Sequence, residues 1–304
     1  AIEAYDNAIA LNDENAWYFV NRGSAKHSMG DEDGAIADYD QSLRLDRRMA
    51  DAYIGKSNVY LGRQDLENAM SFVNEALEAQ PRNAMALGAR GWIFYKMDNF
   101  EEAMQDYNQS IRYAPRMPVT YNNRGVCFAA VANFDRAITD YSRAIELVEY
   151  SPITYANRGT AYFTQGDFES AAEDFEKAVE MAPNLVEAMN SLAWFRCVCP
   201  DDQFRDGEAA LATAKAACEA TRWENWTAVD TYAAACAETG DFAEAKKWAA
   251  KAVELAPADR VPACRDRLNL YEQDTPFRSN EGKTSEPDQR DRRFPVPEDG
   301  DSEG

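Results

Sequence analysis

The stretch of sequence that decides the fold runs from Tyr155 to Pro183 and reads YANRGTAYFTQGDFESAAEDFEKAVEMAP. A Gly-Asp turn signal at Gly166 divides it into two segments, and each segment places small and apolar residues at helical spacing. Pro183 stops the second segment, because proline cannot continue a helix. The stretch is therefore predicted to form two helices joined by a tight turn.

The same pattern recurs along the chain at a constant period. Gly91, Gly125 and Gly159 are evenly spaced, and each directly follows an arginine. A second ladder consists of alanines, and its step slips slightly near the end: Ala35, Ala69, Ala103, Ala137, Ala171, Ala210 and Ala245. One helical hairpin cannot bury its apolar stripe alone, so neighbouring hairpins must stack. The predicted fold class is all-α, a solenoid of helix-turn-helix repeats.

These repeated positions resemble the tetratricopeptide repeat family. Aromatic residues stand early in the first helix and again three residues after its small residue: Phe19, Tyr53, Tyr121, Tyr155, Tyr60, Phe94, Phe128 and Tyr162. The second helix carries an aromatic position and a second small position, and a proline closes most repeats: Tyr39, Tyr107, Tyr141, Phe175, Ser42, Ala76, Ser110, Ala144, Ala178, Ala217, Ala252, Pro81, Pro115, Pro183 and Pro257. The resemblance covers roughly residues 1–257 and implies a right-handed α-α superhelical solenoid.

The predicted domain organisation has three parts. Residues 1–257 form the solenoid, in which 1–15 match only a second helix and about seven repeats follow, the sixth with an insertion near 199–207. The insertion and the repeat after it look like the C-terminal repeats of a subset of bacterial family members, so we expect a bacterial source. Residues 258–274 are predicted to be a capping helix, and 275–304 a disordered acidic tail. Because the pattern begins inside a repeat, we expect the chain to be a fragment.

The charge balance limits the classes of partner. The chain has 32 Lys+Arg against 53 Asp+Glu, a net charge of −21, which argues against binding to nucleic acid or to an anionic membrane surface. No apolar run approaches the ~20 residues of a membrane span. A protein or peptide partner with apolar and basic residues is favoured instead.

In four repeats an arginine and an aspartate occur together, always at the same spacing. The pairs are Arg22 with Asp38, Arg90 with Asp106, Arg124 with Asp140 and Arg158 with Asp174. Repeats without the arginine also lack the aspartate. We interpret each pair as a structural ion pair between the two helices of one repeat, because an arginine that is already neutralised is a poor ligand for phosphate or carboxylate.

Asparagines near the same arginines are the candidate peptide-binding residues: Asn21, Asn122, Asn123 and Asn157. In the family, an amide at this place holds the backbone of a bound peptide, since it offers both a donor and an acceptor. Solvated or helix-linking asparagine is the equally favoured alternative. Apolar anchors are expected on the same face, with core packing as the competing interpretation: Trp17, Trp92, Tyr95, Phe163 and Trp194.

Other members of the family bind the acidic C-terminus of a heat-shock chaperone through basic residues on their first helices. The positions that should supply them carry no basic side chain: Val20, Ser24, Gly55, Met85 and Ala89. We therefore do not expect this partner.

The sequence offers little for catalysis, and no cofactor or metal is expected. His27 is the only histidine and has no cysteine or serine constellation around it, and no phosphate-binding glycine motif occurs. The six cysteines lack paired zinc-ligand spacing and are interpreted as small packing residues. Free thiols favour a reducing compartment such as the cytoplasm, but the compartment stays open.

The predicted function is a non-catalytic scaffold that binds a peptide or partner segment in a concave groove. Two alternatives remain. The repeats could be the docking arm of a larger enzyme whose catalytic part is absent from this chain, or they could be a self-assembling structural module. The sequence does not separate the three, since a repeat architecture by itself does not imply one function.

Overall fold

The computed structural model describes residues 1–279. Within them the chain forms sixteen α-helices and one short 3-10 helix, and it forms no strand. The helices fall into two units, residues 1–127 and the described part of 128–298, with the boundary inside α8 (Pro118–Ala130). Each unit is described by itself.

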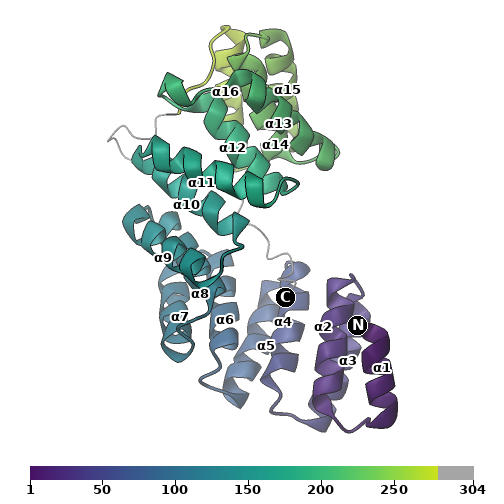
Figure 1. The fold of residues 1–304 in the computed structure, drawn as a ribbon. Helices are drawn as coiled ribbons and strands as arrows, with labels where there is room; N and C mark the ends of the chain where they lie inside the picture. The colour runs from purple at the N-terminus through teal and green to yellow at the C-terminus, as the bar shows by residue number, and fades with distance from the viewer. Residues whose placement is uncertain (280–304) are drawn as a thin grey trace. The chain divides into compact units, whose positions relative to one another are not determined.

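The first unit contains seven helices and the first part of α8. Consecutive helices run side by side in opposite directions as hairpins (Figure 1). The helices are α1 (Ile2–Leu11), α2 (Ala16–Ser28), α3 (Glu32–Leu45), α4 (Ala50–Gly62), α5 (Leu66–Ala79), α6 (Ala84–Lys96) and α7 (Phe100–Tyr113). The predicted leading half-repeat corresponds to α1.

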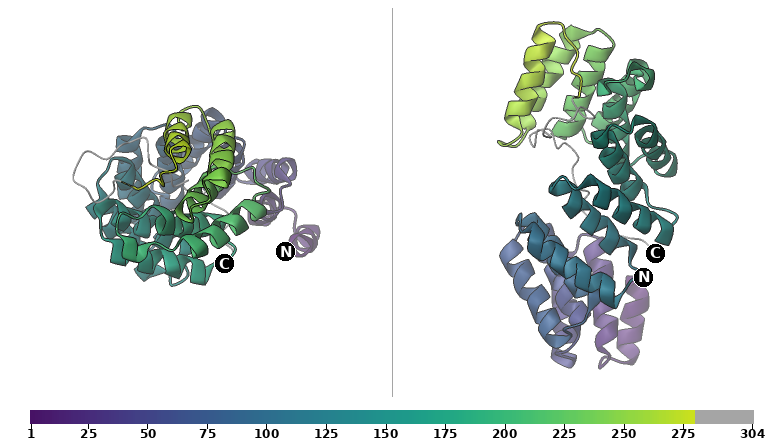
Figure 2. Two further views of the ribbon diagram at one scale, coloured as in Figure 1. Left: turned by 90° about the horizontal axis from the view of Figure 1, so that it is seen from above. Right: turned by 90° about the vertical axis from the view of Figure 1, so that its left-hand side faces the viewer.

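The second unit contains the end of α8 and all later helices (Figure 2). They are α9 (Phe134–Leu147), α10 (Pro152–Gln165), α11 (Phe168–Met181), α12 (Val186–Val198), η1 (Asp202–Phe204), α13 (Gly207–Ala220), α14 (Trp226–Glu238), α15 (Phe242–Leu255) and α16 (Val261–Glu272). The short helix η1 lies in the predicted insertion of the sixth repeat. No helix within residues 1–279 is long and apolar enough to cross a membrane.

Side chains at the turns fix where most second helices begin. Asp31, Asp65 and Asp167 each accept a hydrogen bond from the backbone N–H three residues later. Such a cap satisfies a donor that the first turn of a helix leaves without an internal partner. The turn just before the cap needs a left-handed residue, with φ of +80° at Gly30 and +85° at Gly166. The sequence thus sets the helix boundaries locally, before any packing.

The two helices of a hairpin pack through a small residue against an aromatic ring. A Cβ atom added to Gly91 would lie 2.8 Å from Tyr107 Cε1, and one added to Gly159 would lie 3.0 Å from Phe175 Cδ1. No side chain fits there without moving the ring. Both rings are completely buried. This interlocking explains why the small position and the aromatic position repeat together.

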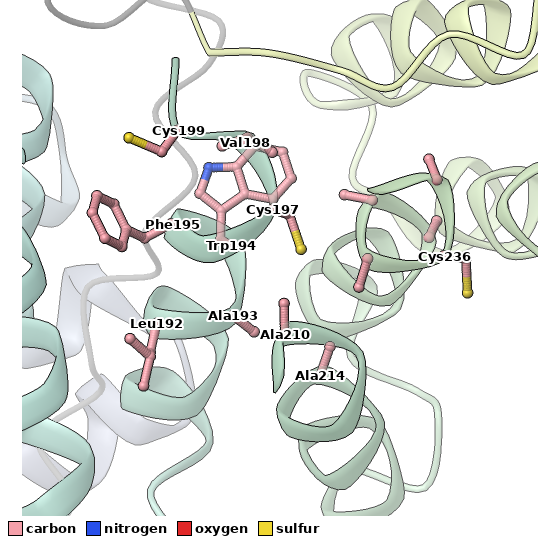
Figure 3. Packing of buried hydrophobic residues seen from close by; sticks show 14 of the residues in the cluster. Leu192, Ala193, Trp194, Phe195, Cys197, Val198, Cys199, Ala210, Ala214 and Cys236 are labelled. Atoms are coloured by element: carbon pink, nitrogen blue, oxygen red, sulfur yellow. The ribbon is translucent and has the colours of Figure 1, made fainter. Parts of the chain in front are cut away.

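The largest core cluster lies in the second unit around α12. Figure 3 shows Phe195 on one side of this helix and Cys197 on another, with Ala210 and Ala214 of α13 nearby. Phe195 packs edge-on against Phe163 at 5.3 Å between ring centroids, and Phe204 of η1 covers it at 5.9 Å. The insertion therefore closes the core instead of forming a loose loop.

The chain after α16 does not leave the fold where the tail was predicted to begin. Residues Thr275–Ser279, which we call the C-terminal strap, return to α12. Ser279 N–H donates to Val198 O at 2.9 Å, and the ring of Phe277 lies 5.7 Å from that of Trp194. An aromatic side chain with a partner offsets the entropy of ordering that a purely polar tail cannot offset. The remainder of the predicted tail, 280–304, lies outside the described residues.

Candidate functional site

The structure brings the predicted arginine and aspartate partners together in three repeats. Arg22 donates from Nε to Asp38 Oδ2 at 2.8 Å and from Nη2 to Asp38 Oδ1 at 2.6 Å. The same two-pronged geometry joins the other two: Arg90 with Asp106, and Arg158 with Asp174. The aspartates are nearly buried while the arginines keep about a fifth to a quarter of their surface, as in the 27% of Arg90. In each of the three pairs, two guanidinium nitrogens are already occupied by the aspartate.

Arg124 and Asp140 lie in different units, so their pairing stays a prediction. Arg124 Nη1 donates to Asn108 Oδ1 at 2.6 Å within the first unit. Asp140 is buried in the second.

Each of these arginines also holds the preceding repeat, which the sequence analysis missed. The remaining guanidinium nitrogen donates to a side chain 16 residues earlier, on the second helix of that repeat: Asp6, Asn74, Asn108 or Ser142. The signal was present, because each acceptor directly follows the aromatic or apolar residue of that helix. Lys56, which lacks an aspartate partner within its own repeat, uses the same position and donates to Asp40 at 2.8 Å.

Two of the buried aspartates have pKa values that are shifted in opposite directions. Burial alone raises the pKa of Asp38, but hydrogen bonds from Arg22 and from Lys26, whose Nζ lies 2.8 Å away, outweigh it, and the pKa falls below its usual value. Burial raises the pKa of Asp174, and the single cation Arg158 does not compensate. Asp38 thus has two cations to offset its burial, whereas Asp174 has one.

The four candidate asparagines are in different environments. Asn21 is exposed, and the structure gives its side chain no hydrogen bond within residues 1–279. Asn122 is half-buried and donates to Asn123 Oδ1 at 3.1 Å. Asn123 is only 7% exposed, and Asn157 is half-buried. A peptide can approach Asn21 and Asn122, whereas Asn123 mainly supports its neighbour.

The candidate aromatic anchors separate into surface and core residues. Trp17 is 52% exposed. Trp92 is buried and stacks on the half-buried Tyr95 at 5.1 Å. Phe163 and Trp194 are buried in the core of the second unit. This corrects the expectation of exposed anchors at Trp92, Phe163 and Trp194, because the rings of the chain itself already cover them.

Trp194 is covered by the chain's own C-terminal elements. Phe277 of the strap lies against its ring, and the guanidinium of Arg267 lies 5.9 Å from the ring centre. Arg267, on α16, donates to both carboxylate oxygens of Asp230 at 3.1 and 2.8 Å. Both side chains are almost completely buried, with 3% and 0% exposed. Asp230 lies three residues before the small residue of α14, and Asn122 lies at the equivalent position of α8. In α8 this position was predicted to bind a peptide, whereas in α14 it binds Arg267 of the capping helix.

A second ion-pair group fixes the strap and the insertion together. Glu238 of α14 pairs with Arg205 Nε at 3.1 Å and with Arg278 Nη2 at 2.6 Å. Arg278 also donates to Cys197 O at 3.3 Å, and Arg205 donates to Cys199 O at 2.8 Å. The sequence analysis missed these pairs, because their members are far apart in the chain and do not repeat.

The cysteines are poor candidates for chemistry. All six are buried. Burial raises the pKa of Cys127 and of Cys218 to about 12 and that of Cys236 to about 11, so the thiols stay protonated and weakly nucleophilic. Within residues 1–279 no group of three or more His, Cys, Asp or Glu side chains is placed to hold a metal ion.

The first unit, in contrast, has side chains on its first helices that reach the surface. We call them the first-helix face: Trp17, Asn21, Ser24, Asn58, Met85 and Asn122. Trp17, Asn21 and Ser24 follow one stripe of α2, and Met85 is 53% exposed. An exposed apolar ring beside an exposed amide, as at Trp17 and Asn21, is the combination that suits an extended peptide.

Stacked helical hairpins with this interlocking make the chain an α-helical repeat protein. Family models of the tetratricopeptide repeat match residues 20–84, 86–117, 152–185 and 231–259. The chain belongs to the tetratricopeptide repeat family, as the repeat pattern predicted, and its fold is the solenoid type of that family. Such repeats indicate a scaffold for protein–protein interaction.

Solved structures share this fold at low sequence identity. A chain of the APC/C hetero-tetramer Cut9–Hcn1 is 16% identical with a TM-score of 0.68, over 76% of this chain and 45% of that chain. Pseudomonas aeruginosa pilF is 16% identical with a TM-score of 0.59, over 68% and 92%. A tetratricopeptide repeat protein from Parabacteroides merdae is 13% identical with a TM-score of 0.56, over 84% and 98%. A search of the curated proteins finds no match.

Proposed function

We propose that this chain is a non-catalytic scaffold that binds an extended peptide segment of a partner protein on the first-helix face of its first unit. The observation that carries the proposal is the pair Trp17 and Asn21. They lie one helical turn apart, Trp17 is 52% exposed, and Asn21 is exposed with no hydrogen bond within the described residues. An exposed ring next to an exposed amide provides an apolar contact surface and a backbone-pairing group in one place.

The two side chains divide the work of recognition. The indole of Trp17 offers an apolar contact surface with little conformational entropy to lose. The amides of Asn21 and Asn122 can pair with the N–H and C=O of any peptide backbone, so they give affinity without reading sequence. The net charge of −21 favours a partner whose other residues are apolar or basic.

Selection from a random peptide library on the immobilised chain tests the proposal. We expect enriched peptides that carry apolar and basic residues. Fluorescence anisotropy then measures their binding to the wild type and to the variants Trp17→Ala and Asn21→Ala. We expect Trp17→Ala to weaken binding about tenfold or more, because a buried aromatic anchor contributes ~2 kcal/mol, and Asn21→Ala to weaken it less.

Matched controls come from exposed residues away from this face. Tyr113→Ala removes another exposed ring, and Asn269→Ala removes another exposed amide, on α16. Neither should change the dissociation constant. Peptides that bind all four variants equally well would place the peptide site elsewhere and refute the proposal.

A further inference from the structure

Six exposed arginines lie at one edge of the first unit, where each second helix ends and the next first helix begins. We call them the arginine edge: Arg44, Arg47, Arg48, Arg82, Arg112 and Arg116. Because the helices alternate in direction, the loops after α3, α5 and α7 lie at the same end of the unit. A hydrogen bond of 3.3 Å from Gln80 Nε2 to Arg48 O joins two of these loops directly.

The arginine edge differs from the rest of the first unit in having no ion pairs. Arg22, Arg63 and Arg90 each contact a carboxylate at 2.6 or 2.7 Å. None of the six edge arginines forms an ion pair within residues 1–279, and the only side-chain bond among them is from Arg44 Nε to Gln41 at 2.8 Å. In a chain with 53 acidic residues, a row of guanidinium groups without carboxylate partners is unexpected.

The edge also holds a shallow hollow of about 460 Å³. Arg44 and Arg47 line it together with Leu43, Asp40 and Tyr53. Lys56 already neutralises Asp40 at 2.8 Å, so the two arginines dominate the charge of the hollow. A side chain that enters it meets guanidinium groups next to Leu43 and Tyr53.

Few carboxylates oppose these arginines. Asp46 and Asp51 lie beside the first loop, and Glu75 and Glu78 lie on α5, where they interact with Tyr53. Asp46 is occupied, since its side chain accepts the Arg48 backbone N–H at 2.8 Å. The loops after α3, α5 and α7 therefore carry six arginines against these four carboxylates, which leaves them locally positive on a strongly acidic chain. The loop after α1, at the same end of the unit, carries Asp13 and Glu14 and lies outside the arginine edge.

We propose that the arginine edge binds an acidic, extended segment of another protein. This surface is separate from the first-helix face, so the inference goes beyond the function proposed above. Successive loops carry Arg48, Arg82 and Arg116 at equivalent places of the repeat, with Arg47 beside the first of them. Adjacent packed helices are ~8–10 Å apart, and an extended chain advances ~3.3 Å per residue. A carboxylate at about every third residue matches this spacing.

Carboxylate chemistry fits the edge better than a nucleic acid does. Guanidinium binds carboxylate through two parallel hydrogen bonds. A polyphosphate chain is long and repelled by the rest of a surface with a net charge of −21, whereas a short peptide feels only charges within a Debye length of ~10 Å. The local excess of arginine therefore decides the interaction with a short acidic segment.

The probe is a fluorescein-labelled peptide of repeated Glu-Gly-Ser, long enough to span the three loops. The same peptide with Gln in place of Glu is the neutral reference, and an oligothymidylate of equal length tests for nucleic acid. Fluorescence anisotropy at about 0.1 M salt, where the Debye length is ~10 Å, measures binding to the wild-type chain. We expect the Glu peptide to bind, the Gln peptide to bind at least about tenfold more weakly, and added salt to weaken the Glu peptide further.

Two triple variants with the same change of net charge give the decisive comparison. The edge variant is Arg47→Gln, Arg82→Gln and Arg116→Gln, and the control is Arg136→Gln, Arg222→Gln and Arg265→Gln, all exposed positions of the second unit. Since all six side chains are exposed, circular dichroism should show both variants folded. The edge variant should lose about tenfold in affinity and the control less than about twofold. Equal losses, no preference for Glu over Gln, or tighter binding of the oligothymidylate would each overturn the proposal.

Discussion

The two units use equivalent positions on their first helices in opposite ways. In the first unit, Ser24 of α2 is exposed and Asn122 of α8 is half-buried. In the second, Trp194, the equivalent of Ser24, is 4% exposed and Asp230, the equivalent of Asn122, is completely buried, because α16 and the C-terminal strap cover them. A repeat position therefore has no fixed role. Its role depends on whether another part of the same chain occupies it.

The covering elements of the second unit behave as an internal ligand. Phe277 supplies an aromatic ring, Arg278 an ion pair with Glu238 and a hydrogen bond to a carbonyl, and Ser279 a backbone hydrogen bond. These are the interactions by which an extended peptide is held elsewhere. Part of the second unit, around α12 and α14, is thus covered by its own chain, whereas the first-helix face of the first unit stays exposed.

The largest expected loss of stability comes from breaking the buried ion pair under the covering elements of the second unit. Arg267→Leu should destabilise the chain by about 3–5 kcal/mol, because it leaves the carboxylate of Asp230 buried without a cation. In the open unit, Arg90→Leu should cost less, about 2 kcal/mol, since Arg90 keeps 27% of its side chain in solvent. Urea unfolding of each variant, followed by circular dichroism, gives both values.

The double variant Arg267→Leu with Asp230→Leu is the control for this prediction. It removes both charges, so its loss of stability should be clearly smaller than that of Arg267→Leu alone. Losses that simply add would show that the two side chains do not depend on each other, and the covering of this part of the second unit would then rest on the strap alone.

A smaller effect is expected when the strap loses its ring. Phe277→Ala should lower the free energy of unfolding by about 2 kcal/mol, because a half-buried ring no longer covers Trp194. Acrylamide should then quench the tryptophan fluorescence more strongly. Truncation after Asp274 should have the same effect on quenching. If neither change increases quenching, the strap does not shield Trp194 and the contrast between the units is weaker than the structure indicates.

Acidification should change the contributions of Asp38 in the first unit and Asp174 in the second to the free energy of unfolding in opposite directions. The pKa of Asp38 is lowered by Arg22 and Lys26, so its ion pairs stabilise the fold above the unfolded-state pKa and are lost as the pH falls through the folded-state pKa. The pKa of Asp174 is raised by burial, so its ionised form disfavours folding, and acid relieves that cost as the pH falls through the folded-state value. Carboxyl-carbon NMR should show Asp174 titrating at higher pH than Asp38. The reverse order would contradict the role assigned to the second cation, Lys26.

The sequence predicted the fold because its determinants repeat. The small and aromatic positions, the turn signals and the arginine–aspartate spacing occur several times, so chance coincidences are averaged out. The helix bounds follow from local caps such as Asp65 and Asp167, which need no knowledge of packing. The arginine–aspartate pairs could be derived in the same way, because their spacing is constant from repeat to repeat.

The candidate site was predictable only in part, because burial by distant segments leaves no periodic signal. Phe163 and Trp194 are aromatic residues of first helices, as Trp17 is, yet the first is enclosed by the rings around α12 and the second by a strap from the far end of the described chain. The contact of Arg267 with Asp230 spans 37 residues and occurs once. Sequence periodicity predicts which face of a helix a residue lies on, but only the packed structure shows which other residues cover that face.

The smallest expected effect concerns the turn inside the hairpins. At this position Gln64 and Asp98 of the first unit and Ala132 of the second have φ of +59°, whereas Gly30 of the first unit and Gly166 and Gly240 of the second are glycines. A non-glycine residue in this left-handed region costs ~1–2 kcal/mol, and glycine loses part of that gain through its greater freedom in the unfolded chain. Gln64→Gly should therefore stabilise the first unit by about 0.5–1 kcal/mol.

The reverse exchange in the second unit provides the matched test. Gly166→Gln should destabilise by a similar amount, since Gly166 has φ of +85°. Urea unfolding of the two variants against the wild type measures both changes. If both substitutions destabilise, the side chain of Gln64 contributes something that its backbone geometry does not show. Opposite signs would show that backbone strain at this turn position decides the direction of the change, in either unit.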